Sequence, residues 1–157
     1  MQDVVKSFPA VKLLVVGEGK MKNALVKEVS SLGIKDNVLF LPQVEGAKNV
    51  LAAMDVFVMP SLQEGLGLAL MEAMAQGLAV VGSAVGGIKT LIKDQVNGLL
   101  VEPADAAGLA KGILQLINDA QMRKNLGSNA RKFIMENFSK EKMVKSTEGV
   151  YRQCKLR

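Results

Sequence analysis

The sequence contains no histidine, and its single cysteine is Cys154, near the end of the 157 residues. Without imidazole, a histidine general base, a serine–histidine triad and histidine-ligated zinc are all excluded. One cysteine cannot form a disulfide within the chain or a cysteine-ligated metal cluster. Several common kinds of catalytic and structural centre are therefore ruled out by composition.

Aromatic residues make up only 4% of the chain, and no apolar run approaches the roughly 18 residues of a membrane span. The net charge of +5 is spread along the sequence, whereas nucleic-acid binding favours a basic stripe with interleaved aromatics. The amino-terminal residues differ from a secretory signal, because Asp3 and Lys6 come first and Lys12 interrupts a short apolar run. We therefore expect a soluble, cytoplasmic protein that binds no nucleic acid.

The hydrophobic content of 49% over 157 residues is typical of one compact domain, residues 1–157. Short apolar runs alternate with helical patterns, and continuously apolar runs are typical of buried strands covered on both faces by helices. The five expected strands are residues 11–17, 37–42, 55–60, 78–83 and 97–102. The expected helices are residues 20–31, 46–53, 67–76, 88–93, 105–119, 121–136 and 140–154, with Asp105 and Ser139 as caps. The sequence predicts an α/β, Rossmann-like three-layer domain with a mainly parallel sheet of about five strands flanked by helices, and a helical C-terminus.

Residues 60–77, "PSLQEGLGLALMEAMAQG", follow the third expected strand at the edge of the sheet where parallel α/β domains bind ligands. Gly65 and Gly67 remove side chains where the loop enters the helix, so a ligand can approach the backbone N–H groups of residues 65–68. Those donors and the helix dipole form an anion site without any basic side chain. The segment therefore favours a ligand that carries phosphate.

Two glutamates, Glu64 and Glu72, flank this helix start. Glu72 lies about five residues inside the helix, which at 1.5 Å per residue is on the order of 7 Å along the axis. That separation is too large for a paired-carboxylate centre, but it suits a phosphate between two polyhydroxyl groups, as in a nucleoside diphosphate sugar. The plainer interpretation stays open: Glu72 as a solvated helix residue, and Glu64 as an acidic group placed only for the helix dipole.

Taken with five further segments, this stretch resembles the carboxyl-terminal, donor-binding domain of the retaining family 4 glycosyltransferases, which have a two-domain B-type fold. Those segments are "LLVVGEG", "NVLFLPQV", "MDVFVMPS", "GLAVVGSAVGGI" and "VNGLLVEP", and the match runs from about Val11 to Phe138. Its most specific element is a pair of glutamates separated by seven residues, here Glu64 and Glu72.

The resemblance implies a role for each residue of the donor site. Glu64 would be the catalytic residue, contacting the hydroxyls of the donor sugar, and Glu72 would hold the ribose. The remaining donor-binding residues would be Gly65, Leu66, Gly67 and Leu68 through their backbone at the distal phosphate, Gly17 and Gly19 at the border of the cleft, and the backbone around Val44 at the base. Residues 85–87 would line the same crevice.

The resemblance also implies that parts of the complete enzyme are missing. The chain would lack the amino-terminal acceptor domain and a central strand, so residues 12–16 would pair directly with residues 55–58. We expect retaining hexosyl transfer from a UDP-, GDP- or ADP-sugar in the full enzyme, in the cytoplasm or at the inner membrane surface, and an inactive isolated chain. No cofactor or metal is expected, since no Asp-x-Asp motif occurs. Self-association through the incomplete sheet is a further expectation.

Other functions remain open on the sequence. One is a non-catalytic nucleotide-sugar-binding or interaction module from a split or truncated gene. Another is an NAD-type dinucleotide-binding domain, because "VVGEGKMKNAL" places glycines after a strand, although Lys22 replaces the third glycine of the fingerprint. A sugar-nucleotide epimerase is disfavoured, because such enzymes would be expected to use histidine.

Overall fold

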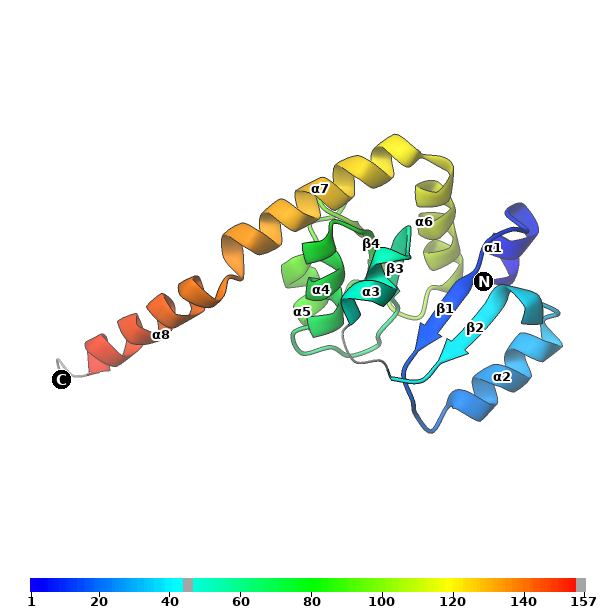
Figure 1. Ribbon diagram of the computed structural model, residues 1–157, viewed down its shortest axis with the longest axis horizontal. Coiled ribbons are helices and arrows are strands. Elements are labelled where there is room, and N and C mark those ends of the chain that lie inside the picture. Colours follow the sequence, from blue (N-terminus) through cyan, green and yellow to red (C-terminus); the bar gives the residue numbers. More distant parts are fainter. Residues whose placement is uncertain (44–46, 155–157) are drawn as a thin grey trace.

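The computed structural model describes residues 1–43 and 47–154 (Figure 1). The elements follow in the order α1 (Gln2–Ser7), β1 (Leu13–Val16), α2 (Lys22–Ser31), the 3-10 helix η1 (Lys35–Asn37), β2 (Val38–Leu41), α3 (Ala47–Ala52), β3 (Val56–Met59), α4 (Leu68–Gln76), β4 (Ala79–Ser83), α5 (Gly86–Leu91), β5 (Leu99–Val101), α6 (Ala106–Asn118), α7 (Ala120–Asn137) and α8 (Lys140–Cys154). The predicted α/β class, the five strand positions and the helical C-terminus are confirmed.

The strands form two parallel sheets instead of one. β1 pairs with β2, and β3, β4 and β5 pair in that order. Across residues 1–43 and 47–154, no strand pairing joins β1 to β3. The prediction that residues 12–16 pair with residues 55–58 is therefore wrong, and a gap separates the two sheets.

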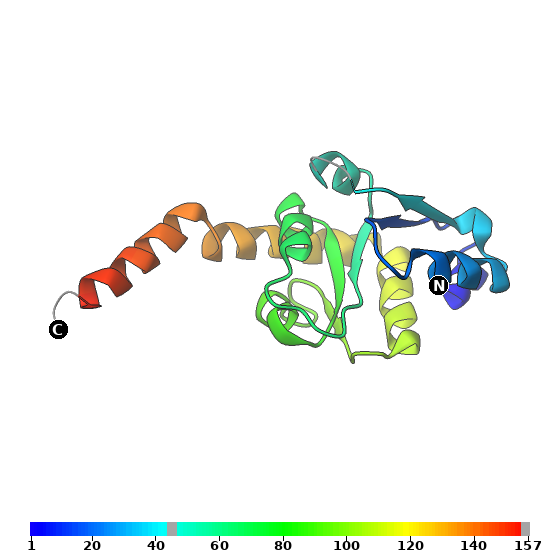
Figure 2. The same cartoon turned by 90° about the horizontal axis from the view of Figure 1, so that it is seen from below.

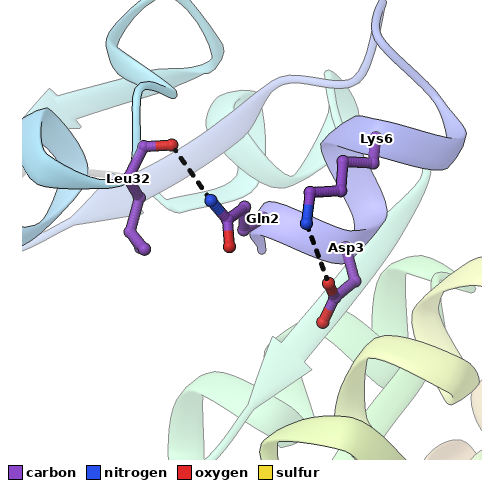
Figure 3. Close-up of polar contacts among 4 residues, drawn as sticks. All are labelled: Gln2, Asp3, Lys6 and Leu32. Carbon is purple, nitrogen blue, oxygen red and sulfur yellow. Dashed lines mark hydrogen bonds and ion pairs between the residues drawn. The ribbon is translucent and has the colours of Figure 1, made fainter.

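Helix α1, which the sequence analysis did not predict, contacts both halves of the molecule. Its Val4 is fully buried in a cluster that includes residues of α6. On the other side, the Gln2 Nε2 donates to the carbonyl oxygen of Leu32 at 3.4 Å, just after α2 (Figure 3). The Asp3–Lys6 ion pair within α1, at 3.9 Å, is exposed and contributes little. Helix α1 therefore bridges the part of the molecule that contains α2 and the part that contains α6.

Strand β4 is the centre of the core. Val80 packs in a cluster with α4, α5 and α7, and Val81 packs in a second cluster with α1 and α6. Successive strand residues point to opposite faces, so helices cover both faces of β4, as a three-layer fold requires. The prediction of five buried strands is wrong in part, because β1, β2 and β3 are only half-buried. The gap leaves β1 and β3 open at one edge, and α2, beside β1 and β2, buries none of its residues.

The carboxyl-terminal helices leave the body of the molecule. α7 packs across α4, whereas α8 extends away from the sheets and buries none of its residues (Figures 1 and 2).

The predicted caps are present: Asp105 accepts from the N–H of Gly108 at 2.8 Å, and Ser139 accepts from the N–H of Lys142 at 3.2 Å. A backbone hydrogen bond at Glu141 and a bond to the Ser139 side chain lower the pKa of Glu141. No helix in the described ranges is long and apolar enough to cross a membrane.

Asp119 is a cap that the sequence analysis missed, and its removal should destabilise the protein. Its carboxylate accepts from the N–H of Met122 at 2.8 Å at the start of α7. We expect Asp119→Ala to lower the free energy of unfolding by about 1 kcal/mol, measured by urea denaturation. Asn118→Ala, one residue earlier and exposed, should change stability by less than about 0.5 kcal/mol. Equal losses in the two variants would contradict the capping role.

Candidate functional site

The candidate site lies where β3 ends and α4 begins. The chain leaves β3 at Met59, crosses residues 60–67 and enters α4 at Leu68. Gly67, the residue before the helix, has a φ of 76°, in the left-handed region where side chains other than that of glycine are strained. The chain therefore turns into α4 at a position that favours glycine.

The backbone N–H groups at this helix start are free to bind a ligand. The Met71 N–H donates to the carbonyl oxygen of Gly67 at 3.0 Å, which is the first bond of the helix ladder. Within the described part of the chain, the N–H groups of residues 65–68 make no hydrogen bond to the protein, and no side chain caps the helix. Free N–H donors at the positive end of a helix dipole are able to bind an anion.

The start of α5 packs directly against the loop that leads into α4. The Gly87 N–H donates to the carbonyl oxygen of Glu64 at 3.2 Å. A Cβ atom added to Gly86 would collide with that same oxygen, and one added to Gly87 would collide with the carbonyl oxygen of Gly65. The backbones therefore touch, and only glycine permits this approach. The sequence analysis missed this supporting role, although the Gly-Gly pair directly after β4 was a signal for it.

The two glutamates take different positions. Glu72, in the second turn of α4, is exposed and lines a cavity of about 670 Å³ together with Pro60, Ser61 and Val16. Glu64 is half-buried, and its Cγ lies 3.6 Å from the position that a Cβ on Gly67 would take. Neither carboxylate forms an ion pair or a hydrogen bond with the side chains of the described residues. Both carboxylates can therefore accept hydrogen bonds from a ligand.

Gly17 and Gly19, which the sequence analysis placed at the site, follow the carboxyl-terminal end of β1, just as the candidate loop follows that of β3. Gly17 has a φ of 125°, and its N–H donates to the carbonyl oxygen of Leu41 at 3.0 Å. No atom lies within 4 Å of a Cβ built on Gly17 or on Gly19, so both positions are open. The preceding residue, Val16, lines the cavity that Glu72 also lines. The structure thus places the ends of β1 and β3 around one cavity, whereas Val44 lies outside the described residues.

Comparison with known proteins identifies the family. The model of the family "Glycosyl transferases group 1" matches residues 1–133. Among curated proteins, the N-acetyl-alpha-D-glucosaminyl L-malate synthase of Bacillus anthracis is 37% identical over 157 residues, covering 96% of this chain and 41% of the relative. The D-inositol 3-phosphate glycosyltransferase of Salinispora arenicola is 38% identical over 129 residues, covering 81% of this chain and 29% of the relative. The chain thus spans less than half the length of these relatives.

Solved structures of glycosyltransferases share the fold. S. aureus TarM, in a complex with fondaparinux, alpha-GlcNAc-glycerol and UDP, superposes with a TM-score of 0.90 at 31% identity, over 96% of this chain and 31% of TarM. Anabaena HepE in complex with UDP-glucose gives 0.86 at 26% identity, over 99% of this chain and 44% of HepE. The predicted resemblance to B-type glycosyltransferases is thereby confirmed. This chain belongs to the group 1 glycosyl transferases.

Proposed function

We propose that the chain is the donor-binding part of a glycosyltransferase that moves a hexose from a nucleoside diphosphate sugar to an acceptor hydroxyl, with retention of the anomeric configuration. In this proposal the backbone of Gly65, Leu66, Gly67 and Leu68 binds the distal phosphate, Glu64 contacts the sugar, and Glu72 the ribose. Gly17 and Gly19 border the cleft, and the backbone around Val44 meets the base. Residues 1–157 form one donor-binding unit.

The observation that carries this proposal is the start of α4, whose N–H groups make no hydrogen bond within the described part of the chain and which Glu64 and Glu72 flank in the sequence. Such donors stabilise the negative charge that develops on the leaving diphosphate, which is the main electrostatic requirement of sugar transfer. The carboxylates on either side can each accept hydrogen bonds from a pair of hydroxyls. Solved relatives with UDP or UDP-glucose in their complexes support a nucleotide-sugar ligand.

The helix start also supports a site that works without a bound divalent metal. The sequence contains no Asp-x-Asp motif, the arrangement with which many transferases hold a metal against the diphosphate. The amides and the helix dipole would supply the positive potential instead. In this proposal, donor affinity is the same in EDTA and in magnesium, which calorimetry can measure.

We further propose that the isolated chain binds the donor but transfers no sugar. The chain spans 41% of the length of its B. anthracis relative. Glycosyl transfer needs an acceptor positioned against the sugar, with water excluded. Glu72 is exposed here, and its cavity is open to solvent. Transfer at a typical enzyme rate of roughly 10 per second would contradict this proposal.

Calorimetric titration of UDP, UDP-glucose, GDP-mannose and ADP-glucose tests the donor site. Hydrogen bonds to charged groups contribute about 1.5–3 kcal/mol, so Glu72→Gln should lower the affinity for the preferred nucleotide and for its sugar conjugate equally, by about 10- to 100-fold. Glu64→Gln should lower the affinity for the sugar conjugate only.

The matched control is Glu28→Gln, which makes the same chemical change on the exposed surface of α2. It should leave every affinity within about twofold of wild type. If Glu72→Gln binds the preferred nucleotide as tightly as wild type, the ribose assignment is wrong. If Glu64→Gln weakens the free nucleotide as much as its sugar conjugate, the sugar assignment is wrong.

A further inference from the structure

Positive charge is concentrated on the last two helices, α7 and α8. Residues 120–154 carry eight basic and three acidic side chains, whereas residues 1–119 carry ten basic and twelve acidic ones. The sequence analysis described the charge as spread along the chain, and this count corrects that description. All four basic side chains of α8 are exposed, and so are Lys124, Arg131 and Lys132 of α7. A basic cluster of this kind favours an anionic partner.

Helix α8 also has an apolar side that no other part of the described chain covers. Met143 and Val150 are seven residues apart, which is two helical turns, so they lie on one side of the helix. Val144 and Tyr151, each one residue further on, border that side. These four side chains are between 50% and 69% exposed, and the helix extends away from the sheets (Figures 1 and 2). Apolar side chains gathered on one exposed side of a helix mark an interaction surface.

Anionic lipid fits both the charge and the apolar side of α8. A basic amphipathic helix lies in the membrane interface with its apolar side at the acyl boundary, and its lysines and arginines reach the headgroups. Lys145 and Arg152 have stems long enough to reach back from the polar side, and tyrosine is a side chain typical of the interface. The two acidic residues of α8 leave the helix with a net charge of +2, and the exposed basic residues of α7 add to it.

A nucleic acid fits this surface less well. Binding to single strands uses several aromatic side chains on which bases stack, and α8 contains one aromatic residue, Tyr151. Contacts to phosphates alone would leave Met143 and Val150 exposed to water. Lipid is the anionic partner that also covers the apolar side.

We propose that α8 docks on an anionic lipid bilayer, with Met143, Val150 and Tyr151 in the interface and the basic residues of α7 and α8 over the headgroups. The helix lies along the surface and does not cross the bilayer, since no helix in the described ranges is long and apolar enough to do so. None of the candidate site residues lies on α7 or α8. The docking surface is therefore independent of the proposed donor chemistry.

Tyrosine fluorescence tests this proposal directly on the 157-residue chain. Tyr151 is the only tyrosine and the sequence has no tryptophan, so the emission reports α8 alone. At about 1 mM accessible lipid, more than about half of the chain should sediment with phosphatidylcholine vesicles that contain roughly 30% phosphatidylglycerol. Less than about a tenth should sediment with phosphatidylcholine alone. In the anionic vesicles, lipids brominated on the acyl chain near the headgroup should quench the Tyr151 emission. About 0.5 M salt should release most of the chain, because the Debye length falls to about 4 Å.

Two variants with the same new side chain separate the apolar contact from the charge. Val150→Glu places a carboxylate on the apolar side of α8, and Gln153→Glu places one on the same helix outside that side. One charge near an anionic surface changes affinity about fivefold, so Gln153→Glu should weaken vesicle binding by about that factor. Val150→Glu also loses the apolar contact and should weaken binding by about 50-fold. Because α8 buries none of its residues, both melting temperatures should stay within about 2 °C of wild type.

A second pair of variants tests where the positive charge acts. Lys145→Gln combined with Arg152→Gln removes two charges from α8 and should weaken binding to the anionic vesicles by about 25-fold. The matched control, Lys22→Gln combined with Lys27→Gln, removes two exposed charges from α2. It should leave the affinity within about twofold of wild type, since screening limits the effect of distant charges.

Several results would overturn the proposal. These are no binding at about 1 mM anionic lipid, equal binding to both kinds of vesicle, or binding without quenching of Tyr151. Equal losses in Val150→Glu and Gln153→Glu would show that the apolar side does not touch the membrane. A concentration-dependent dimer that Val150→Glu abolishes, measured by sedimentation without lipid, would assign the apolar side to a second copy of the chain.

Discussion

Gly127→Ala is expected to lower the free energy of unfolding by about 2 kcal/mol, although alanine is the better helix former by about 1 kcal/mol. Gly127 lies within α7, and a Cβ added there would collide with the carbonyl oxygen of Gly77. It would also lie 3.3 Å from the backbone nitrogen of Ala79, at the start of β4. Overpacking typically costs 1–3 kcal/mol, and more where the obstacle is backbone that cannot rotate away. The collision therefore outweighs the gain in helix propensity.

The melting temperature reports this loss, because in a domain of this size 2 kcal/mol corresponds to a decrease of roughly 4–8 °C. The same substitution at Gly149, within α8, is the matched control. No atom lies within 4 Å of a Cβ built on Gly149, so the only expected effect on stability is the higher helix propensity of alanine. Gly149→Ala should increase helicity and stabilise α8 by about 0.5–1 kcal/mol. If both variants were stabilised, α7 would not pack on the α4–β4 turn as the structure shows.

The positions of most elements could be predicted from the sequence because the signals for them are local. The run "LAVVGS" predicts the buried strand β4, observed at Ala79–Ser83. Asp105 before an apolar helical pattern predicts the start of α6, observed at Ala106. Each signal lies within a few residues of the element that it specifies, so no knowledge of the tertiary arrangement is needed.

The gap between the sheets could not be predicted in the same way, because strand pairing depends on contacts that are distant in sequence. Helix α1 makes such distant contacts on both sides of the gap: Val4 packs against α6, and Gln2 bonds to Leu32. The segment "MQDVVKSF" is too short to show a helical pattern, so the sequence analysis predicted no helix there. Direct pairing of residues 12–16 with residues 55–58 was expected for another reason, because the resemblance implied that a central strand is missing between them.

The sequence pointed to the start of α4 as a candidate site, but it did not indicate which residues pack against this loop. Gly65 and Gly67 indicated a helix start open to an anion, and within the described residues the N–H groups of this start make no hydrogen bond. The backing of this loop by Gly86 and Gly87 depends on the packing of α5, which no local pattern specifies. A substitution at this contact should therefore change both ligand binding and stability.

Gly87→Ala should weaken donor binding by about 10- to 100-fold and also destabilise the fold. The added methyl group would collide with the carbonyl oxygen of Gly65 and lie 2.9 Å from the Cα of Leu66. The loop would have to move, and the N–H groups at the start of α4 would move with it. The loss of one or two hydrogen bonds to a charged phosphate, at about 1.5–3 kcal/mol each, accounts for the expected change in affinity.

Gly65→Ala separates the effect on the ligand from the effect on the fold. No protein atom lies within 4 Å of a Cβ built on Gly65, so the melting temperature should stay within about 2 °C of wild type. If a phosphate approaches the Gly65 backbone, the methyl group obstructs it, and calorimetry with UDP should show about tenfold weaker binding. Thr90→Ala, exposed on α5, should change neither quantity. Wild-type affinity in Gly65→Ala would show that the phosphate binds elsewhere, whatever Gly87→Ala does to stability.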